Sequence, residues 1–265
     1  VSKTYLEEIK TEEFGEKLEG LLLSRNNDLE GIVNGIDYEE YNPLTDEYIY
    51  MNYDKKTIFL KGKNKEKLQE ELGLEINKGI PIIGMVSRLT HQKGCDLITN
   101  VLEEVLKQKV QVVILGTGDY MYEAAFRSFE ERYKGRVSAN IKFSNELAHK
   151  IYAGSDLFLM PSLFEPCGLG QLIALRYGTL PIVRETGGLK DTVIPYNKYT
   201  GRGTGFSFAN YRPDELLNTI KLALEVYKEK KIFKNLVVQA MEEDNSWEKS
   251  AKEYFKLYDN LINKK

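Results

Sequence analysis

Residues 80–115 read IPIIGMVSRLTHQKGCDLITNVLEEVLKQKVQVVIL and contain three structural elements in succession. Residues 80–87 and 110–115 are short, apolar and rich in β-branched side chains, which is typical of buried strands. Between them, the apolar residues of 95–108 recur every three or four positions, which predicts an amphipathic helix. A strand, a helix and a second strand in this order predict a parallel pair joined by a helical crossover.

The same alternation continues to the end of the chain. We expect further strands at residues 137–143, 156–160, 180–184 and 205–207. We expect further helices at residues 120–134, 146–153, 168–178, 213–228, 232–242 and 247–263. The strands are continuous apolar runs rather than alternating ones, as expected when helices cover both faces of a sheet. The fold class that follows is α/β, with a Rossmann-like, doubly wound parallel sheet.

Three parts of the chain do not follow this alternation. Residues 4–9 and 14–25 have short helical patterns, residues 41–62 indicate a long excursion over the surface, and the lysine-rich residues 61–67 predict a solvated face. The expected last helix carries an apolar face, made of Trp247, Tyr254, Phe255, Tyr258 and Leu261. Two partners for this face stay open: the rest of this domain, or a domain outside the sequence.

Composition argues against several kinds of function. With 37 Lys and Arg against 40 Asp and Glu, the net charge is −3, which gives no reason to expect nucleic acid or an anionic membrane as a partner. Two cysteines and two histidines argue against a disulfide framework and a structural zinc site. The sequence has no Asp-x-Asp pair to bridge a metal to a diphosphate, so no metal is expected. No apolar run approaches the roughly 18 residues of a membrane span.

The loop after the first expected strand carries two cations. In an open parallel sheet, ligands bind at the carboxyl ends of the strands. Residues 87–94 (SRLTHQKG) place Arg88 and Lys93 at this edge. A guanidinium fork and a mobile ammonium could neutralise a diphosphate and stabilise it as a leaving group. A pair of exposed surface cations fits the spacing equally well.

The loop after the second expected strand contains Gly116 and Gly118. These glycines would let the backbone approach a ligand, or would form only a tight strand-to-helix turn. The dinucleotide fingerprint needs a third glycine at position 121, where this chain has Met121. A nicotinamide-dependent oxidoreductase is therefore disfavoured.

Two further loops lead into helices through glycines. Residues 161–170 (PSLFEPCGLG) carry Glu165, whose carboxylate could accept hydrogen bonds from sugar hydroxyls or face a developing oxocarbenium charge; the alternative is a helix cap. Thr186, Gly187 and Gly188 follow the next strand, and their backbone amides could hold a phosphate or form only a turn.

Three other reactive side chains receive no catalytic role. His149 lies among apolar neighbours and His91 lies in the cationic loop, and both are interpreted as structural. Cys167 has no readable His or Asn partner that would make it a nucleophile.

These loops, in this order, resemble those of one family, the bacterial glycogen synthases and plant starch synthases. The resemblance covers nearly the whole chain, in residues 1–5 (VSKTY), 29–37, 84–94, 115–119, 151–156, 161–172, 177–181 and 186–193. The run FEPCGL at 164–169, together with LRYGT at 175–179, is specific to this family. The Glu-x-x-Gly core and the Ser-Arg-Leu element are shared more widely.

The resemblance implies the C-terminal half of a GT-B glycosyltransferase, in which two Rossmann-like domains flank the active site. It implies a retaining glucosyltransferase that moves glucose from ADP-glucose, or UDP-glucose in some members, to the non-reducing end of an α-1,4-glucan. ADP is the implied product, and neither a cofactor nor a metal is implied. Front-face transfer and double displacement both stay open.

The resemblance also implies roles for individual residues. Catalytic roles fall to Arg88 and Lys93, on the donor diphosphate, and to Glu165, on the transferred glucose. The implied donor-binding residues are Asn34, Gly116, Gly118, Phe143, Cys167, Gly168, Leu169, Thr186, Gly187 and Gly188. Phe143 stands where the family often has a Tyr that stacks on adenine, and it keeps the ring. Gly170 replaces a Thr of some relatives, which removes one side-chain contact.

The resemblance further predicts a division of the chain. Residues 1–28 would be a hinge or linker from an N-terminal domain that the sequence lacks, residues 29–245 the nucleotide-sugar-binding domain, and residues 246–265 a crossover helix. We expect this segment alone to bind ADP and to transfer nothing, because the family's Lys-x-Gly-Gly-Leu loop and catalytic-site His are absent from it.

The expected location is the cytoplasm, or a plastid in a plant or alga. Two alternatives stay open: a related GT-B enzyme that uses a UDP-sugar, and a non-catalytic module that binds nucleotide or glucan.

Overall fold

The computed structural model describes residues 1–263 and contains one parallel sheet of six strands. The strands are β1 (Ile82–Val86), β2 (Gln111–Leu115), β3 (Val137–Asn140), β4 (Leu157–Met160), β5 (Leu180–Arg184) and β6 (Phe206–Phe208). Their order in the sheet is β3-β2-β1-β4-β5-β6. The chain therefore starts in the middle of the sheet, builds outward to one edge, and returns to build the other half, which is the doubly wound arrangement predicted from the sequence.

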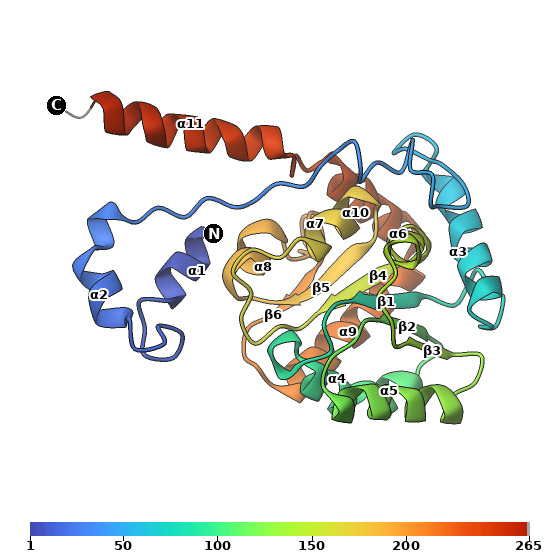
Figure 1. The fold of residues 1–265 in the computed structure, drawn as a ribbon. Helices are drawn as coiled ribbons and strands as arrows, with labels where there is room; N and C mark the ends of the chain where they lie inside the picture. The colour runs from blue at the N-terminus through green and yellow to red at the C-terminus, as the bar shows by residue number, and fades with distance from the viewer. Residues whose placement is uncertain (264–265) are drawn as a thin grey trace.

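Helices cover both faces of this sheet (Figure 1). The helices of the central region are α3 (Lys61–Glu71), α4 (Cys95–Leu106), α5 (Tyr120–Arg132), α6 (Asn145–Gly154), α7 (Gly170–Arg176), α8 (Gly187–Thr192), α9 (Pro213–Lys228) and α10 (Lys230–Glu242). The terminal helices are α1 (Lys3–Glu8), α2 (Glu19–Ser24) and α11 (Trp247–Asn263), and short 3-10 turns lie at η1 (Asn26–Asp28), η2 (Ile58–Leu60) and η3 (His91–Lys93). Helices α4, α5 and α9 lie below the sheet in Figure 1, and α6, α7, α8 and α10 lie above it. No helix within residues 1–263 is long and apolar enough to cross a membrane.

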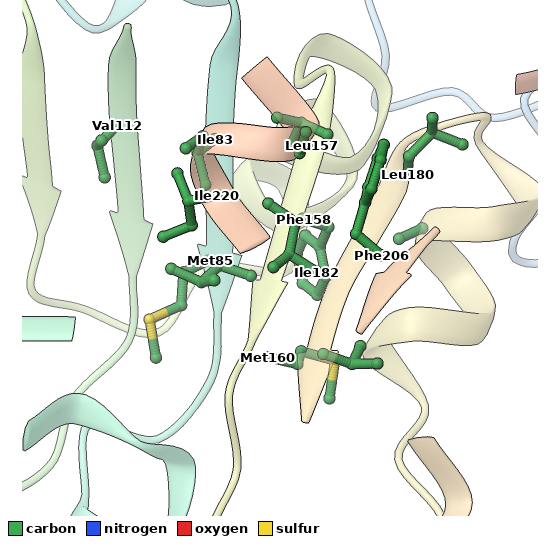
Figure 2. Close-up of a cluster of buried hydrophobic side chains, with 14 of the residues drawn as sticks. Ile83, Met85, Val112, Leu157, Phe158, Met160, Leu180, Ile182, Phe206 and Ile220 are labelled. Atoms are coloured by element: carbon green, nitrogen blue, oxygen red, sulfur yellow. The ribbon is translucent and has the colours of Figure 1, made fainter. Parts of the chain in front are cut away.

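The core lies between these layers and is built from the strands predicted as continuous apolar runs. Every residue of β2 and β4 is buried. Figure 2 shows Ile83, Phe158 and Ile182 of neighbouring strands beside Ile220 of α9, and all four side chains are at most 2% exposed. Burial on both faces explains why these strands lack the alternation of polar and apolar residues that a half-exposed sheet has.

The predicted surface excursion at residues 41–62 is wrong in part, because this irregular and largely exposed segment also carries buried side chains. Tyr53 is completely buried, and its hydroxyl donates to the carbonyl of Tyr177 at 2.7 Å. Asp46 is also buried. The segment has no helical or strand periodicity, but its side chains fill the space beside α6 and α7.

The predicted solvated face at residues 61–67 is also wrong in part. Lys65 is 4% exposed, and its ammonium donates to Asp156 at 2.7 Å and to the Tyr227 hydroxyl at 2.9 Å. A buried ammonium is tolerated here because a carboxylate and a phenol oxygen replace its water.

Helices α2 and α11 extend away from the sheet and its covering helices (Figure 1). Ser250 is the only buried residue described for α11, whereas Phe255, Tyr258 and Leu261 are 59–71% exposed. Of the two partners left open for this apolar face, packing against the chain's own domain is therefore wrong for residues 247–263. The predicted crossover helix reaches residue 265, and its last two residues lie outside the described part of the chain.

Candidate active site

A cavity of about 320 Å³ lies at the carboxyl ends of β1 and β2 and forms one part of the candidate site. We call it the first cavity. Arg88 reaches it from the loop after β1, Gly116 from the loop after β2, and Phe143 from the loop after β3. Tyr41 and Tyr152 line it as well. Three of the predicted site residues, far apart in sequence, thus converge on one cavity, as strand ends at one edge of a parallel sheet should.

Gly116 and Gly118 have different surroundings. A β-carbon at Gly116 would lie 1.8 Å from the Ser87 carbonyl oxygen, so only glycine lets these two loops meet at the cavity wall. A β-carbon at Gly118 would lie 2.2 Å from the Leu89 carbonyl oxygen. Gly118 is not among the residues that line the first cavity, and its amide donates to Glu123 at 3.0 Å. Gly118 therefore forms the tight turn that was weighed as its alternative role.

Phe143 presents its ring to the opening of the first cavity. Strand β3 ends at Asn140, three residues earlier than predicted, which places Phe143 in the following loop. Its side chain is 91% exposed although it is fully apolar. An exposed ring at the edge of a cavity offers a flat surface on which a planar ligand can stack.

Lys93 and Glu165 form a buried ion pair. The Lys93 ammonium lies 2.5 Å from Glu165 Oε2, and the two side chains are 16% and 7% exposed. The hydroxyl of Ser162 donates to the same carboxylate oxygen at 3.2 Å. From the sequence, Lys93 was predicted to contact a phosphate and Glu165 a sugar. In the structure the two side chains contact each other.

Gln92 connects this ion pair to the first cavity. Its side-chain oxygen accepts a hydrogen bond from Arg88 Nη2 at 3.1 Å, and its backbone oxygen accepts one from the Leu163 amide at 2.9 Å. The loop after β1 is therefore fixed to the loop that carries Glu165. Gln92 and Ser162 were not predicted as site residues; the available signal was that Gln92 directly precedes Lys93 and that Ser162 lies three residues before Glu165.

The loop around Cys167 is shaped by contacts to its carbonyl groups. Gln171 donates its side-chain amide to the Cys167 and Gly168 carbonyls at 3.0 and 2.9 Å. Among residues 1–263, no acceptor is recorded for the backbone amides of Gly168 and Leu169. These two donors are free to bind oxygen atoms of a ligand.

Gly187 and Gly188 lie against the backbone of the same loop. A β-carbon at Gly187 would lie 2.0 Å from the Glu165 carbonyl oxygen, and one at Gly188 would lie 1.9 Å from that of Cys167. Both glycines are thus required for close packing. They lie beside the loop that carries Glu165. The contacts described for them pack two segments of backbone together, and their predicted contact with a phosphate or sugar stays a prediction.

The backbone amide of Gly187, which was predicted to bind a phosphate, donates instead to a carboxylate of the chain itself. Glu8 of α1 accepts hydrogen bonds from the Thr186 hydroxyl at 2.9 Å and from the Gly187 amide at 3.0 Å. Thr4 of the same helix donates to Asp191 of α8 through its backbone amide at 2.9 Å. Helix α1 is therefore attached to α8, a contact between residues nearly 190 positions apart that no local pattern predicts.

Asn34 lies on the other side of Cys167. Its backbone amide donates to Cys167 Sγ at 3.3 Å. Its side chain borders a separate hollow that it shares with Asp191 and Thr192, not the first cavity. Asn34 is thus close to the Glu165 loop and away from Arg88 and Phe143.

His149 is structural, as predicted, and it also borders the first cavity. It is 1% exposed, its Nδ1 lies 2.8 Å from Asp46 Oδ2, and its ring stacks on Tyr41. Burial acts to raise the pKa of Asp46, but hydrogen bonds from His149 and Tyr177 outweigh it and hold that pKa below its ordinary value. His91 lies at the surface and pairs with Asp96 at 3.1 Å. Within residues 1–263, no group of three or more His, Cys, Asp or Glu side chains is placed to hold a metal ion.

Residues 64–237 match the family described as glycosyl transferases group 1. The chain belongs to the group 1 glycosyltransferases. Within that family, the chain is similar to glycogen synthases and to a starch synthase. It is 63% identical to the glycogen synthase of Clostridium perfringens over 99% of its own length, and 56% identical to that of Thermotoga petrophila over its whole length. It spans 54% of each relative, about half of the curated proteins that it matches.

A solved structure supports the same relationship. The glycosyltransferase chain superposes over its full length on 55% of the catalytic domain of starch synthase IV from Arabidopsis thaliana, with a TM-score of 0.93 and 35% identity. That domain was solved bound to ADP and acarbose. The predicted fold class, a Rossmann-like doubly wound sheet of a GT-B glycosyltransferase, is confirmed.

Proposed function

We propose that this chain is the donor-binding half of a glucan synthase that transfers glucose from ADP-glucose to the non-reducing end of an α-1,4-glucan, with retention, without a cofactor, and with release of ADP. One observation carries the proposal: Arg88, Gly116 and Phe143 line one cavity, and Gln92 joins its edge to the buried Lys93–Glu165 pair. The ADP and acarbose bound to the starch synthase IV domain support a nucleotide and a glucan as ligands.

The geometry suggests a division of labour during transfer. The nucleobase stacks on Phe143, and Arg88 faces the diphosphate from the cavity wall. Negative charge builds on the diphosphate as it leaves, and two cations placed beforehand stabilise that charge without reorganisation. Lys93 has three donor protons, so it can hold a phosphate oxygen while it keeps its bond to Glu165.

The sugar then lies between Glu165 and the next two residues of its loop. The carboxylate opposes positive charge at the anomeric carbon, and the free backbone amides of Gly168 and Leu169 donate hydrogen bonds to sugar oxygens. Cys167 contacts the sugar through its backbone, because its thiol already accepts a hydrogen bond from the Asn34 amide.

Calorimetric titration of this chain with ADP, and with UDP for comparison, tests the binding part. We expect ADP to bind more tightly than UDP, and Arg88→Ala to abolish most of the ADP binding, because Arg88 faces the diphosphate. Equal affinity for UDP would contradict ADP-glucose as donor, and full ADP affinity in Arg88→Ala would remove the diphosphate site from the first cavity.

Glucan elongation by a longer protein that carries this chain tests the catalytic part. Arg88→Ala and Lys93→Ala should each cost about 2–4 kcal/mol of transition-state stabilisation. A loss of less than about threefold in kcat/KM, which is below 1 kcal/mol, would refute either assignment. The chain by itself should bind ADP and elongate no glucan, so elongation by the chain alone would contradict its role as one half of the site. A cytoplasmic location stays a prediction.

A further inference from the structure

A second cavity, of about 270 Å³, lies at the opposite edge of the sheet. Asp156, directly before β4, and Gly178, two residues before β5, border it, so the cavity lies at the amino ends of these two strands. Helix α3 and the start of α10 form its walls, together with η2. None of the residues that line the first cavity lines this one.

The lining of the second cavity is strongly cationic. It contains Lys61, Lys65, Lys230 and Lys234, with Asp156 as its one acidic residue. Asp156 is already engaged, because its Oδ2 accepts from Lys65 at 2.7 Å and from the Ile82 amide at 2.8 Å. The other three lysines therefore line one cavity without an acidic partner in its lining.

The hydrogen bonds of Lys61 go to neutral groups and use all three of its donor protons. The Lys61 ammonium donates to the carbonyls of Tyr152 and Ala153 at 3.1 and 2.8 Å and to the Thr179 hydroxyl at 2.7 Å, all of them neutral groups. Burial lowers its pKa to about 7. A bound anion would offset the desolvation that destabilises this charge.

Lys230 is in a similar position at the start of α10. Its ammonium lies 3.3 Å from the centre of the Tyr227 ring, and burial lowers its pKa. The first turn of α10 contains no acidic residue, and Glu229 at its N-cap is the acidic group next to it. A helix start is itself partly positive, so lysines there raise the positive potential instead of balancing it.

The cavity also has an aromatic edge. Phe59 of η2 lines it and is 74% exposed, and Phe233 of α10 lies in its wall. Three cations beside exposed apolar surface suit a small ligand that has both a compact anion and a ring.

We propose that the second cavity binds a small phosphate monoester with a ring or other apolar body, at a site separate from the first cavity. The phosphate dianion accepts hydrogen bonds from Lys230 and Lys234, with the charge of Lys61 beside it, and the apolar body lies on Phe59. A phosphate ester is preferred to a carboxylate because its two negative charges and three free oxygens match several separate ammonium donors.

The test uses phenyl phosphate as the probe and the backbone amide NMR signals of Gly62 and Gly178, which line the cavity, as reporters. We expect saturable shifts of both signals. The variant Lys230→Ala/Lys234→Ala should raise the dissociation constant of phenyl phosphate by about tenfold or more. Both lysines are exposed, so their removal should leave the fold intact.

A matched control removes the same number of charges from exposed lysines outside the cavity. Lys221→Ala/Lys231→Ala changes exposed lysines of α9 and α10 that do not line the cavity, and it should change the affinity by about twofold or less. Arg88→Ala should leave the Gly62 and Gly178 shifts unchanged, because Arg88 belongs to the first cavity.

Three results would overturn the proposal. One is the lack of saturable shifts up to about 10 mM probe, which would correspond to negligible affinity. The second is an equal loss of affinity in the two double variants, which would indicate only a diffuse charge effect. The third is loss of binding in Arg88→Ala, which would place the ester in the first cavity. Inorganic phosphate that binds as tightly as phenyl phosphate would refute the apolar contact with Phe59.

Discussion

The ion pair between Lys93 and Glu165 permits a prediction about stability that is independent of catalysis. Lys93→Met removes the ammonium and keeps an apolar side chain of similar length. It leaves the Glu165 carboxylate, 7% exposed, with the Ser162 hydroxyl as its remaining side-chain donor. Removing one partner of a buried ion pair costs roughly 3–5 kcal/mol. Lys93 is 16% exposed, so water can partly replace the ammonium, and we expect a loss near about 3 kcal/mol.

The double variant Lys93→Met/Glu165→Gln separates this cost from ordinary packing. The glutamine removes the uncompensated charge, and its oxygen can still accept from Ser162. A neutral side chain with one unmet hydrogen bond should cost only about 1 kcal/mol. The double variant should therefore be about 2 kcal/mol more stable than Lys93→Met, although it carries one more substitution.

Urea unfolding followed by far-UV circular dichroism measures both quantities. Lys252→Met is a matched control, because it breaks the pair between Lys252 and Glu248, whose side chains are 69% and 78% exposed. Such an exposed pair should contribute less than about 0.5 kcal/mol. The reasoning is refuted if Lys93→Met costs no more than Lys252→Met, or if the double variant is as unstable as the single one.

Three further predictions address other parts of the chain. Phe143→Ala should leave the free energy of unfolding within about 0.5 kcal/mol, because the ring is 91% exposed. It should weaken ADP binding by about 1–3 kcal/mol in calorimetry, and an unchanged affinity would mean that the ring does not stack on the base. Gly188→Ala should lower the free energy of unfolding by about 1–3 kcal/mol, since the new β-carbon would lie 1.9 Å from the Cys167 carbonyl oxygen. Gly62→Ala, whose β-carbon would meet nothing within 4 Å, is the control that should not be destabilised. Burial lowers the pKa of Lys61 to about 7, whereas a lysine in an unfolded chain has a pKa of roughly 10.4. Between these two pH values the unfolded state binds one more proton than the folded state. The free energy of unfolding therefore rises with pH in this range. The stability of the wild type relative to Lys61→Met should therefore increase from pH 6.5 to 9.5, and a difference that does not change with pH would contradict the lowered pKa.

The parts of the structure that could be predicted are those fixed by local pattern. Strands β1 and β2 and helix α4 follow from apolar runs and helical spacing within residues 80–115. The meeting of Arg88 and Gly116 at one cavity follows from the same pattern, since parallel strands end at one edge. The specific assignment to a family needed more, namely the agreement of several loops in one order.

The parts that could not be predicted depend on contacts between distant residues. Tyr53 is buried by Tyr177, 124 positions away, in a segment without any periodicity. Lys65 lies in a run of charges that resembles a solvated helix face, and its partner Asp156 is 91 positions away. The ion pair of Lys93 with Glu165 joins two loops whose charges the sequence presents separately. In each case the environment of the residue is set by the tertiary structure and not by its neighbours in the chain.

The point at which α11 leaves the domain has a practical consequence for experiments. The amide of Trp247 donates to the Ile36 carbonyl at 3.3 Å, and Gly35 leaves no room for a side chain beside it, because a β-carbon there would lie 2.3 Å from the Trp247 nitrogen. The next residue toward the N-terminus, Asn34, contacts the candidate site through Cys167. Trp247 is the one tryptophan in the sequence and is 47% exposed. Its intrinsic fluorescence therefore reports, without a label, on the point where α11 leaves the domain. A shift of its emission maximum on addition of nucleotide would indicate a movement of α11, and the rate of that shift would give the rate of the movement.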